Sequence, residues 1–223
     1  MSRKVLLVEP NYKNKYPPMG LMKIATYYRT LGDDVTFFKG DLKDLVLDNT
    51  YEDLKTQLYA NDSSIFWEKY KPHICMYLKK GSIEEFNKIP LANENPIIKS
   101  LLKYYRKYFY NKEYFLPQNR KYDRVGITTL FTFYWDITIE TINFAKQLCK
   151  TPDGVMVGGV MATILADRVE EATGIKPFKG TLSRTGILDN NDIIIDTLPL
   201  DYSILEEIDY KYSASDGYLA YMT

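Results

Sequence analysis

Residues 4–24, KVLLVEPNYKNKYPPMGLMKI, decide the fold of this chain. The stretch opens with an apolar run at residues 5–8, whose length and branching are typical of a strand buried on both faces of a parallel sheet. Pro10 ends the run because proline has no amide hydrogen to donate to a neighbouring strand. A polar loop then leads through Gly20 into a helical pattern of apolar residues. A buried strand, a loop and a helix predict the first half of a βαβ unit.

The loop between this strand and helix is the first candidate site. In open α/β sheets, ligands bind in the crevice beyond the carboxyl ends of the strands. The loop of residues 10–20 would lie there, and its first side chains, Asn11 and Tyr12, are therefore candidate ligand-binding residues.

The alternation of strands and helices continues along the chain and predicts an α/β fold, with a doubly wound, Rossmann- or flavodoxin-like parallel sheet of five strands. Gly32 is suited to end the first helix in the left-handed conformation. Crossover helices are expected at residues 136–149 and 162–173. The strands expected after the first are residues 34–39, 124–131, 155–157 and 176–179.

Further candidate binding residues stand where these strands end. They are Thr128, Thr129 and Leu130 on the third strand, Gly158 and Gly159 after the fourth, and Gly180 after the fifth. The glycine pair would let the backbone approach a flat ligand, although a tight strand-to-helix turn explains it equally well. Buried threonines more commonly satisfy backbone groups than bind ligands.

Residues 42–121 interrupt the alternation with helical patterns and a concentration of aromatic residues. The patterns cover residues 42–58, 64–70, 82–87 and 95–110, with prolines between them. We expect a helical, aromatic-rich insertion packed beside the sheet. Residues 99–112 mix Lys, Arg and Tyr as nucleic-acid contacts do, but an amphipathic helix with its tyrosines on the core side is the favoured interpretation.

Composition narrows the class of protein. The 223 residues carry 29 acidic and 29 basic side chains, so no long-range field favours nucleic acid or an anionic membrane. The two cysteines, Cys75 and Cys149, have no metal-site spacing. No apolar run reaches the roughly 18 residues of a membrane span. We expect a cytoplasmic protein with no membrane partner. No dinucleotide or phosphate-loop motif and no catalytic constellation occurs.

With these elements assigned, the chain resembles the N-terminal cobalamin-binding-like domain of radical S-adenosylmethionine (SAM) enzymes over residues 1–41 and 122–223. Three segments carry the resemblance. They are the opening at residues 4–38 with its PPxGL helix start, VGGVMATILADRVEE at 157–171, and TLPLDYSIL at 197–205 followed by DGYLAYMT at 216–223. In the family, a Leu-Pro-x-Asp-Tyr linker leads into the first strand of the radical SAM barrel, directly before a Cys-x-x-x-Cys-x-x-Cys motif.

The resemblance implies a domain organisation and a set of cofactors. Residues 1–41 and 122–188 would form the cobalamin-binding-like domain, with residues 42–121 as the insertion. Residues 189–223 would be a linker and the first strand of a truncated barrel. The 4Fe–4S cluster and SAM would bind only in the missing downstream part, because Cys75 and Cys149 do not match the cluster motif. The downstream barrel, acting on an unknown substrate, would be the partner of this module.

The resemblance also implies a role, and the chain departs from the family in two places. The module would hold base-off cobalamin or cap the catalytic barrel; the alternative is a docking module of α/β fold without a cofactor. The first loop lacks the Asp-x-His-x-x-Gly motif that supplies an axial ligand, so cobalamin would bind without a histidine from this loop. His73, the only histidine, lies in the insertion, where a structural role is more common than metal binding. Residues 179–182, KGTL, replace the family's acidic segment.

Overall fold

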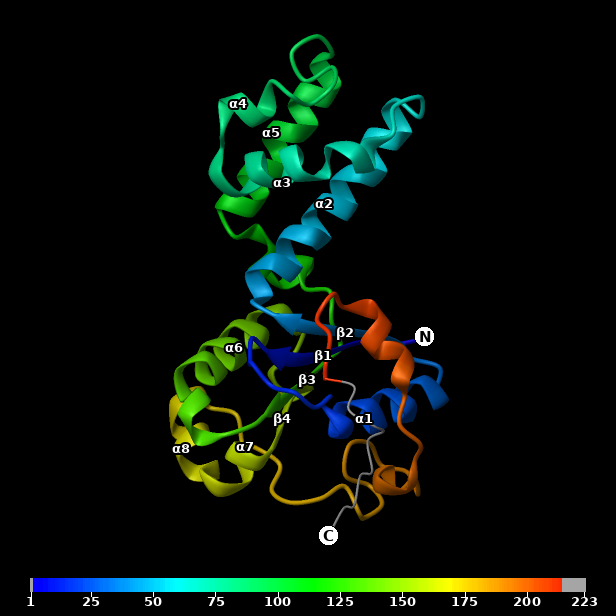
Figure 1. The fold of residues 1–223 in the computed structure, drawn as a ribbon, viewed down its shortest axis with the longest axis vertical. Coiled ribbons are helices and arrows are strands. Elements are labelled where there is room, and N and C mark those ends of the chain that lie inside the picture. The colour runs from blue at the N-terminus through cyan, green and yellow to red at the C-terminus, as the bar shows by residue number, and fades with distance from the viewer. Residues whose placement is uncertain (1, 214–223) are drawn as a thin grey trace. The chain divides into compact units, whose positions relative to one another are not determined.

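The structure, a computed structural model, describes residues 2–213 (Figure 1). Contacts within the chain divide it into two compact units. Unit 1 comprises the described residues of Met1–Asp41 and Lys121–Thr223, and unit 2 is Leu42–Arg120.

Unit 1 is built on an all-parallel sheet in the order β2-β1-β3-β4. β1 is the inner strand predicted from the opening sequence, and residues 5–10 are all buried. Leu7 pairs with Phe37 on one side and with Gly126 on the other, and Gly126 pairs in turn with Met156. The strands are β1 (Lys4–Pro10), β2 (Asp34–Gly40), β3 (Arg124–Thr129) and β4 (Val155–Gly159).

Helices cover both faces of this sheet (Figure 1). α1 (Met19–Thr30) packs its buried side chains on one face, and Gly32 follows it with a φ of 82°, as predicted. The crossover helix α6 (Trp135–Leu148) covers the other face. The single helix expected at residues 162–173 is divided into α7 (Val160–Ile164) and α8 (Ala166–Thr173).

The prediction of a fifth strand was wrong: the sheet has four strands within the described residues. The segment at 176–179 runs beside β4, where Phe178 donates a backbone hydrogen bond to the Val157 carbonyl (2.8 Å). Pro177 has no amide hydrogen, which disfavours a regular ladder at this position. The strand expected at 218–223 lies outside the described residues.

The C-terminal part of unit 1 packs against α1. Ile195 and Ile204 join the apolar cluster of β1, β2 and α1, from the 3₁₀ helices η6 (Ile195–Thr197) and η7 (Tyr202–Glu207). Asp201 caps η7 by accepting a hydrogen bond from the Ser203 amide (3.0 Å). These contacts attach the end of the described chain to the α1 face of the sheet.

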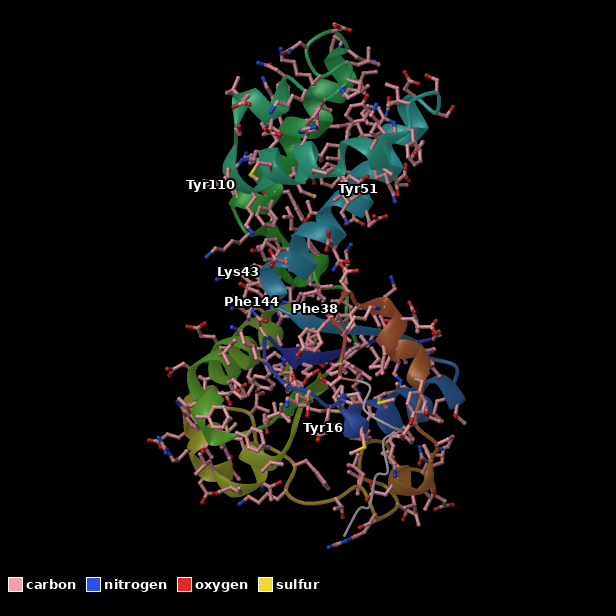
Figure 2. The ribbon with its side chains drawn as sticks, viewed as in Figure 1. Tyr16, Phe38, Lys43, Tyr51, Tyr110 and Phe144 are labelled. Carbon is pink, nitrogen blue, oxygen red and sulfur yellow. The ribbon has the colours of Figure 1, made fainter. Side chains whose placement is uncertain are left out.

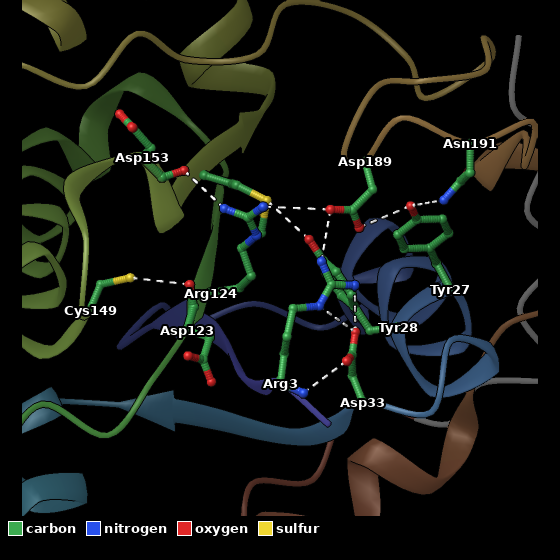
Figure 3. Close-up of polar contacts among 11 residues, drawn as sticks. Arg3, Tyr27, Tyr28, Asp33, Asp123, Arg124, Cys149, Asp153, Asp189 and Asn191 are labelled. Atoms are coloured by element: carbon green, nitrogen blue, oxygen red, sulfur yellow. Dashed lines mark hydrogen bonds and ion pairs between the residues drawn. The ribbon is translucent and has the colours of Figure 1, made fainter. Parts of the chain in front are cut away.

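An ion-pair network ties this C-terminal part to the amino ends of the strands (Figure 3). Arg3, just before β1, pairs with Asp33 (2.6 Å) and Asp189 (2.8 Å). Arg124, the first residue of β3, also lies 3.5 Å from Asp189. The Tyr27 hydroxyl donates to the same carboxylate (3.1 Å). The network lies at the amino ends of the strands and does not occupy their carboxyl ends, where α/β sheets bind ligands.

Unit 2 is helical and has its own core around Trp67, Tyr51, Leu54 and Leu58. The predicted helical patterns leave out residues 71–81, but α3 forms there; Pro72 lies in its first turn, where no amide donor is needed. The helix expected at 64–70 is reduced to the 3₁₀ turn η1. The elements are α2 (Leu42–Asn61), η1 (Trp67–Tyr70), α3 (Lys71–Lys80), α4 (Ile83–Phe86), α5 (Pro96–Tyr110), η2 (Glu113–Phe115) and η3 (Pro117–Asn119).

Candidate functional site

A cavity of about 200 Å³ lies at the carboxyl ends of β3 and β4, on the α1 face of the sheet. Side chains alternate between the two faces of a strand, so Gly126 and Thr128 of β3 share this face. Gly126 is in register with Met156 of β4, and Thr128 with Gly158, which brings all four residues to the same face. Gly126 admits the Leu7 side chain, which would lie 3.0 Å from a Cβ at this position, and only Gly158 leaves open space on this face.

The walls of this cavity are mostly apolar. They come from α1, from the segment after α8 and from the loop before η6. A cavity of about 150 Å³ holds a benzene molecule, so this one has room for a larger planar ring. The polar groups at its walls are Thr128, Thr181 and Asp196, and the apolar ones include Leu21, Ile24, Met156, Phe178, Leu182 and Leu188.

The adjacent glycines Gly158 and Gly159 have different roles. A Cβ added at Gly158 would meet no atom within 4 Å, so this residue leaves open space at the cavity wall. A Cβ at Gly159 would lie 2.3 Å from the Thr129 carbonyl oxygen, and its φ is 106°. Gly159 is thus required by the close approach of β4 to β3, whereas the space at Gly158 is available to a ligand.

The neighbouring residues Thr128 and Thr129 also have different roles. The Thr129 hydroxyl is buried; it donates to the Gly158 carbonyl (2.9 Å) and accepts from the Ala162 amide (2.9 Å). It therefore joins the end of β3 to the end of β4 and the start of α7. Thr128, on the opposite face, lines the cavity.

Thr129→Val should lower the free energy of unfolding by about 2 kcal/mol, because the isosteric valine leaves the Ala162 amide and the Gly158 carbonyl without their partner. Urea denaturation of the purified protein measures this loss. Thr128→Val is the matched control and should change stability by less than about 0.5 kcal/mol. Equal losses in the two variants would contradict the assignment of roles.

The structure brings four of the eight predicted site residues together at this cavity: Thr128, Gly158, Gly159 and Gly180. Asn11 is exposed. Tyr12 is fully buried, shares a hydrogen bond with the Thr138 hydroxyl and stacks on the Tyr134 ring at 4.5 Å.

The other two residues lie inside the framework of unit 1. Thr129 joins the strand ends as described, and the Leu130 carbonyl accepts a hydrogen bond from the Met161 amide (2.9 Å). Burial raises the pKa of Tyr12 to about 12, so its hydroxyl remains protonated at neutral pH. Thr129 and Leu130 thus join β3 to α7 beside the cavity, whereas Tyr12 packs against α6.

Sequence reasoning missed a buried charge cluster at the carboxyl ends of β1 and β2. Glu9 and Lys39 are paired in register, and their side chains are 0% and 2% exposed, with Nζ 3.3 Å from Oε2. Asn14 joins both: its Nδ2 donates to Glu9 Oε1 (2.7 Å), and its Oδ1 accepts from Lys39 Nζ (2.7 Å). Burial raises the pKa of Glu9 and lowers the pKa of Lys39, outweighing the attraction between them in each case.

Two tyrosines from the C-terminal part of unit 1 cover this cluster. The Tyr212 hydroxyl donates to Glu9, and the Tyr210 hydroxyl donates to the Asn14 carbonyl (2.5 Å). Lys39 Nζ lies 4.3 Å from the Tyr210 ring centroid, a cation–π distance. A signal was present in the sequence, since a charged residue follows the apolar run of each strand. The covering of these charges by Tyr210 and Tyr212, however, depends on contacts between residues about 200 positions apart.

The candidate metal ligands in the described part of the chain do not form a cluster. Within residues 2–213, no three His, Cys, Asp or Glu side chains are close enough to hold a metal ion. His73 Nδ1 lies 2.6 Å from Glu85 Oε2, inside unit 2. None of the helices in the described part of the chain combines the length and apolar character that a membrane span needs.

Comparisons with known proteins do not assign the chain to a family. No family model matches the chain, and no curated protein or solved structure matches it either.

Proposed function

We propose that unit 1 is a cobalamin-binding-like domain of Rossmann type, and that its cavity takes the flat base of the cofactor's nucleotide tail. The observation that carries the proposal is the cavity beside Gly158, at the carboxyl ends of parallel strands, where α/β sheets bind ligands. The strand order β2-β1-β3-β4 also matches the first four strands of the flavodoxin-like order.

The residues at the cavity fit such a group. The space at Gly158 and the apolar walls suit a planar ring, and the hydroxyls of Thr128 and Thr181 can form hydrogen bonds with its polar atoms. The corrin ring is too large for about 200 Å³ and would remain outside the cavity. The loop of residues 10–20 contains no histidine, so we propose a base-off form without an axial ligand from this loop. Bound cobalamin would supply a cobalt–carbon bond for group transfer.

We propose further that this domain is the leading module of a radical SAM enzyme, holding cobalamin for a downstream barrel or capping that barrel. The order of the three segments that resemble the family supports this. A reading frame that continues past Thr223 into a Cys-x-x-x-Cys-x-x-Cys motif is the expected finding. A frame that ends without this motif would contradict the radical SAM proposal and leave the cobalamin proposal in place.

Gly158→Leu should lower the affinity of the protein for hydroxocobalamin at least tenfold, because the leucine side chain would enter the space that the ring needs. Titration followed by visible absorbance measures the affinity of both proteins. Cobinamide, which lacks the nucleotide tail, should bind the parent protein more weakly than hydroxocobalamin does. Its affinity should be the same for the parent and for Gly158→Leu.

Glu171→Leu, which adds the same side chain to the exposed surface of α8, is the control and should bind hydroxocobalamin like the parent. Absence of binding at high micromolar hydroxocobalamin would overturn the cofactor proposal and favour the cofactor-free docking module. Equal affinity of parent and Gly158→Leu would show that the tail binds elsewhere.

A further inference from the structure

One side of α5, in unit 2, carries three lysines and an arginine. At 100° per residue, their positions fall within about 100° of arc around the helix axis. The adjoining side of α5 is anchored in the unit 2 core through Ile98 and Leu102. We call Lys99, Lys103, Arg106, Lys107 and Tyr110 the α5 stripe. Lys103, Lys107 and Tyr110 are exposed, whereas Lys99 and Arg106 are half-buried, and Nη1 of Arg106 is buried beneath the surface of unit 2.

The cations of the α5 stripe make no ion pair within the described residues, and α5 itself contains no acidic residue. Two lysines of α3 are ion-paired, in contrast. Lys71 pairs with Asp48 (2.9 Å), and Lys79 pairs with Asp44 (3.1 Å). The zero net charge of the chain therefore conceals an uneven distribution, in which four cations of α5 form no ion pair within residues 2–213.

Aromatic rings lie exposed beside these cations. The sequence favoured tyrosines on the core side of this helix. Tyr105 does pack against the core, but Tyr104 is 57% exposed and Tyr110 is 70% exposed (Tyr110 is labelled in Figure 2). The Arg106 guanidinium lies 4.7 Å from the Tyr110 ring centroid. Tyr104 borders a shallow hollow formed with Pro96, Ile97, Ser100 and Leu101.

We propose that this face of α5 binds single-stranded nucleic acid. Unpaired lysines along a helix neutralise successive phosphates, and exposed aromatic rings stack on unpaired bases whatever the sequence. An anionic membrane fits less well, because surface helices insert an apolar face and that face of α5 is already buried in unit 2. The proposal concerns unit 2 alone and does not depend on the cobalamin proposal for unit 1.

The test is fluorescence anisotropy of the full chain with a labelled single-stranded oligouridine, over about 50 to about 200 mM salt. Neutralisation of three phosphates by Lys99, Lys103 and Lys107 predicts a log–log slope of about −2. Lys103→Gln should make this slope shallower by about 0.7. Tyr104→Ala should weaken binding about fivefold or more without changing the slope, since stacking is not ionic.

Lys79→Gln removes the same charge from a paired lysine of unit 2 and is the matched control; it should leave affinity and slope unchanged. Circular dichroism confirms that each variant is folded. Absence of oligonucleotide binding would overturn the proposal, and so would equal effects of Lys103→Gln and Lys79→Gln. Binding of polyglutamate or phosphatidylserine vesicles as tightly as oligouridine, with no effect of Tyr104→Ala, would also overturn it by showing a general anion-binding surface.

Discussion

Lys39→Met is expected to lower the free energy of unfolding by about 3–5 kcal/mol, because it leaves the Glu9 carboxylate buried without its counter-charge. Glu9 is 0% exposed, and it would keep only the hydrogen bonds from Asn14 and Tyr212. Urea denaturation at neutral pH measures the loss. The double variant Lys39→Met with Glu9→Gln removes the orphaned charge and should recover more than half of it.

The same variant should show a defined pH dependence. Burial already raises the pKa of Glu9 in the parent protein, and removing the attraction of Lys39 raises this pKa further. A raised pKa means that the folded state binds the proton more tightly than the unfolded chain, so acid favours folding. The stability difference between parent and Lys39→Met should therefore narrow as the pH falls from about 7.5 towards the ordinary pKa of glutamate, about 4.3. A difference that widens on acidification would contradict this account.

Gly159→Ala is expected to destabilise unit 1 by about 2–4 kcal/mol, because it combines an unfavourable φ with a backbone clash. Its φ is 106°, and the new Cβ would lie 2.3 Å from the Thr129 carbonyl oxygen, so β3 and β4 would have to separate. Thermal or urea unfolding measures this cost.

Gly158→Ala, one residue earlier, provides the control. The added methyl group would meet no atom within 4 Å and should change the free energy of unfolding by less than about 0.5 kcal/mol. Equal losses of stability in the two variants would show that both glycines are needed for the turn between β4 and α7. A large loss at Gly159 alone assigns the turn to Gly159 and leaves the space at Gly158 for a ligand.

Much of the framework could be predicted from local patterns. The apolar run before Pro10, the glycine after α1 and the helical period of residues 136–149 each depend on near neighbours in the chain, so propensity and periodicity were sufficient. The failures were also local in origin. The predicted helices left out residues 71–80, although the first turn of a helix accepts a proline such as Pro72. A strand was predicted at 176–179, although Pro177 has no amide hydrogen to donate.

The candidate site could be predicted only in part. The rule that ligands bind at the carboxyl ends of strands located Thr128, Gly158 and Gly180 at the cavity. It could not separate Thr128 from Thr129, because adjacent residues of a strand face opposite sides of the sheet and the sequence does not state which side is hollow.

The sequence by itself determined an α/β chain with an inner first strand, a helical segment from residue 42 and glycines at the strand ends, because these follow from patterns a few residues long. Only the tertiary structure decided that Gly126 and Gly158 line one cavity, that Tyr212 covers Glu9, and that the α5 lysines make no ion pair within residues 2–213. Those facts depend on strand register and on contacts between distant segments. The pairing of Glu9 with Lys39, 30 residues apart, is the clearest example, since folding alone brings the two charges together.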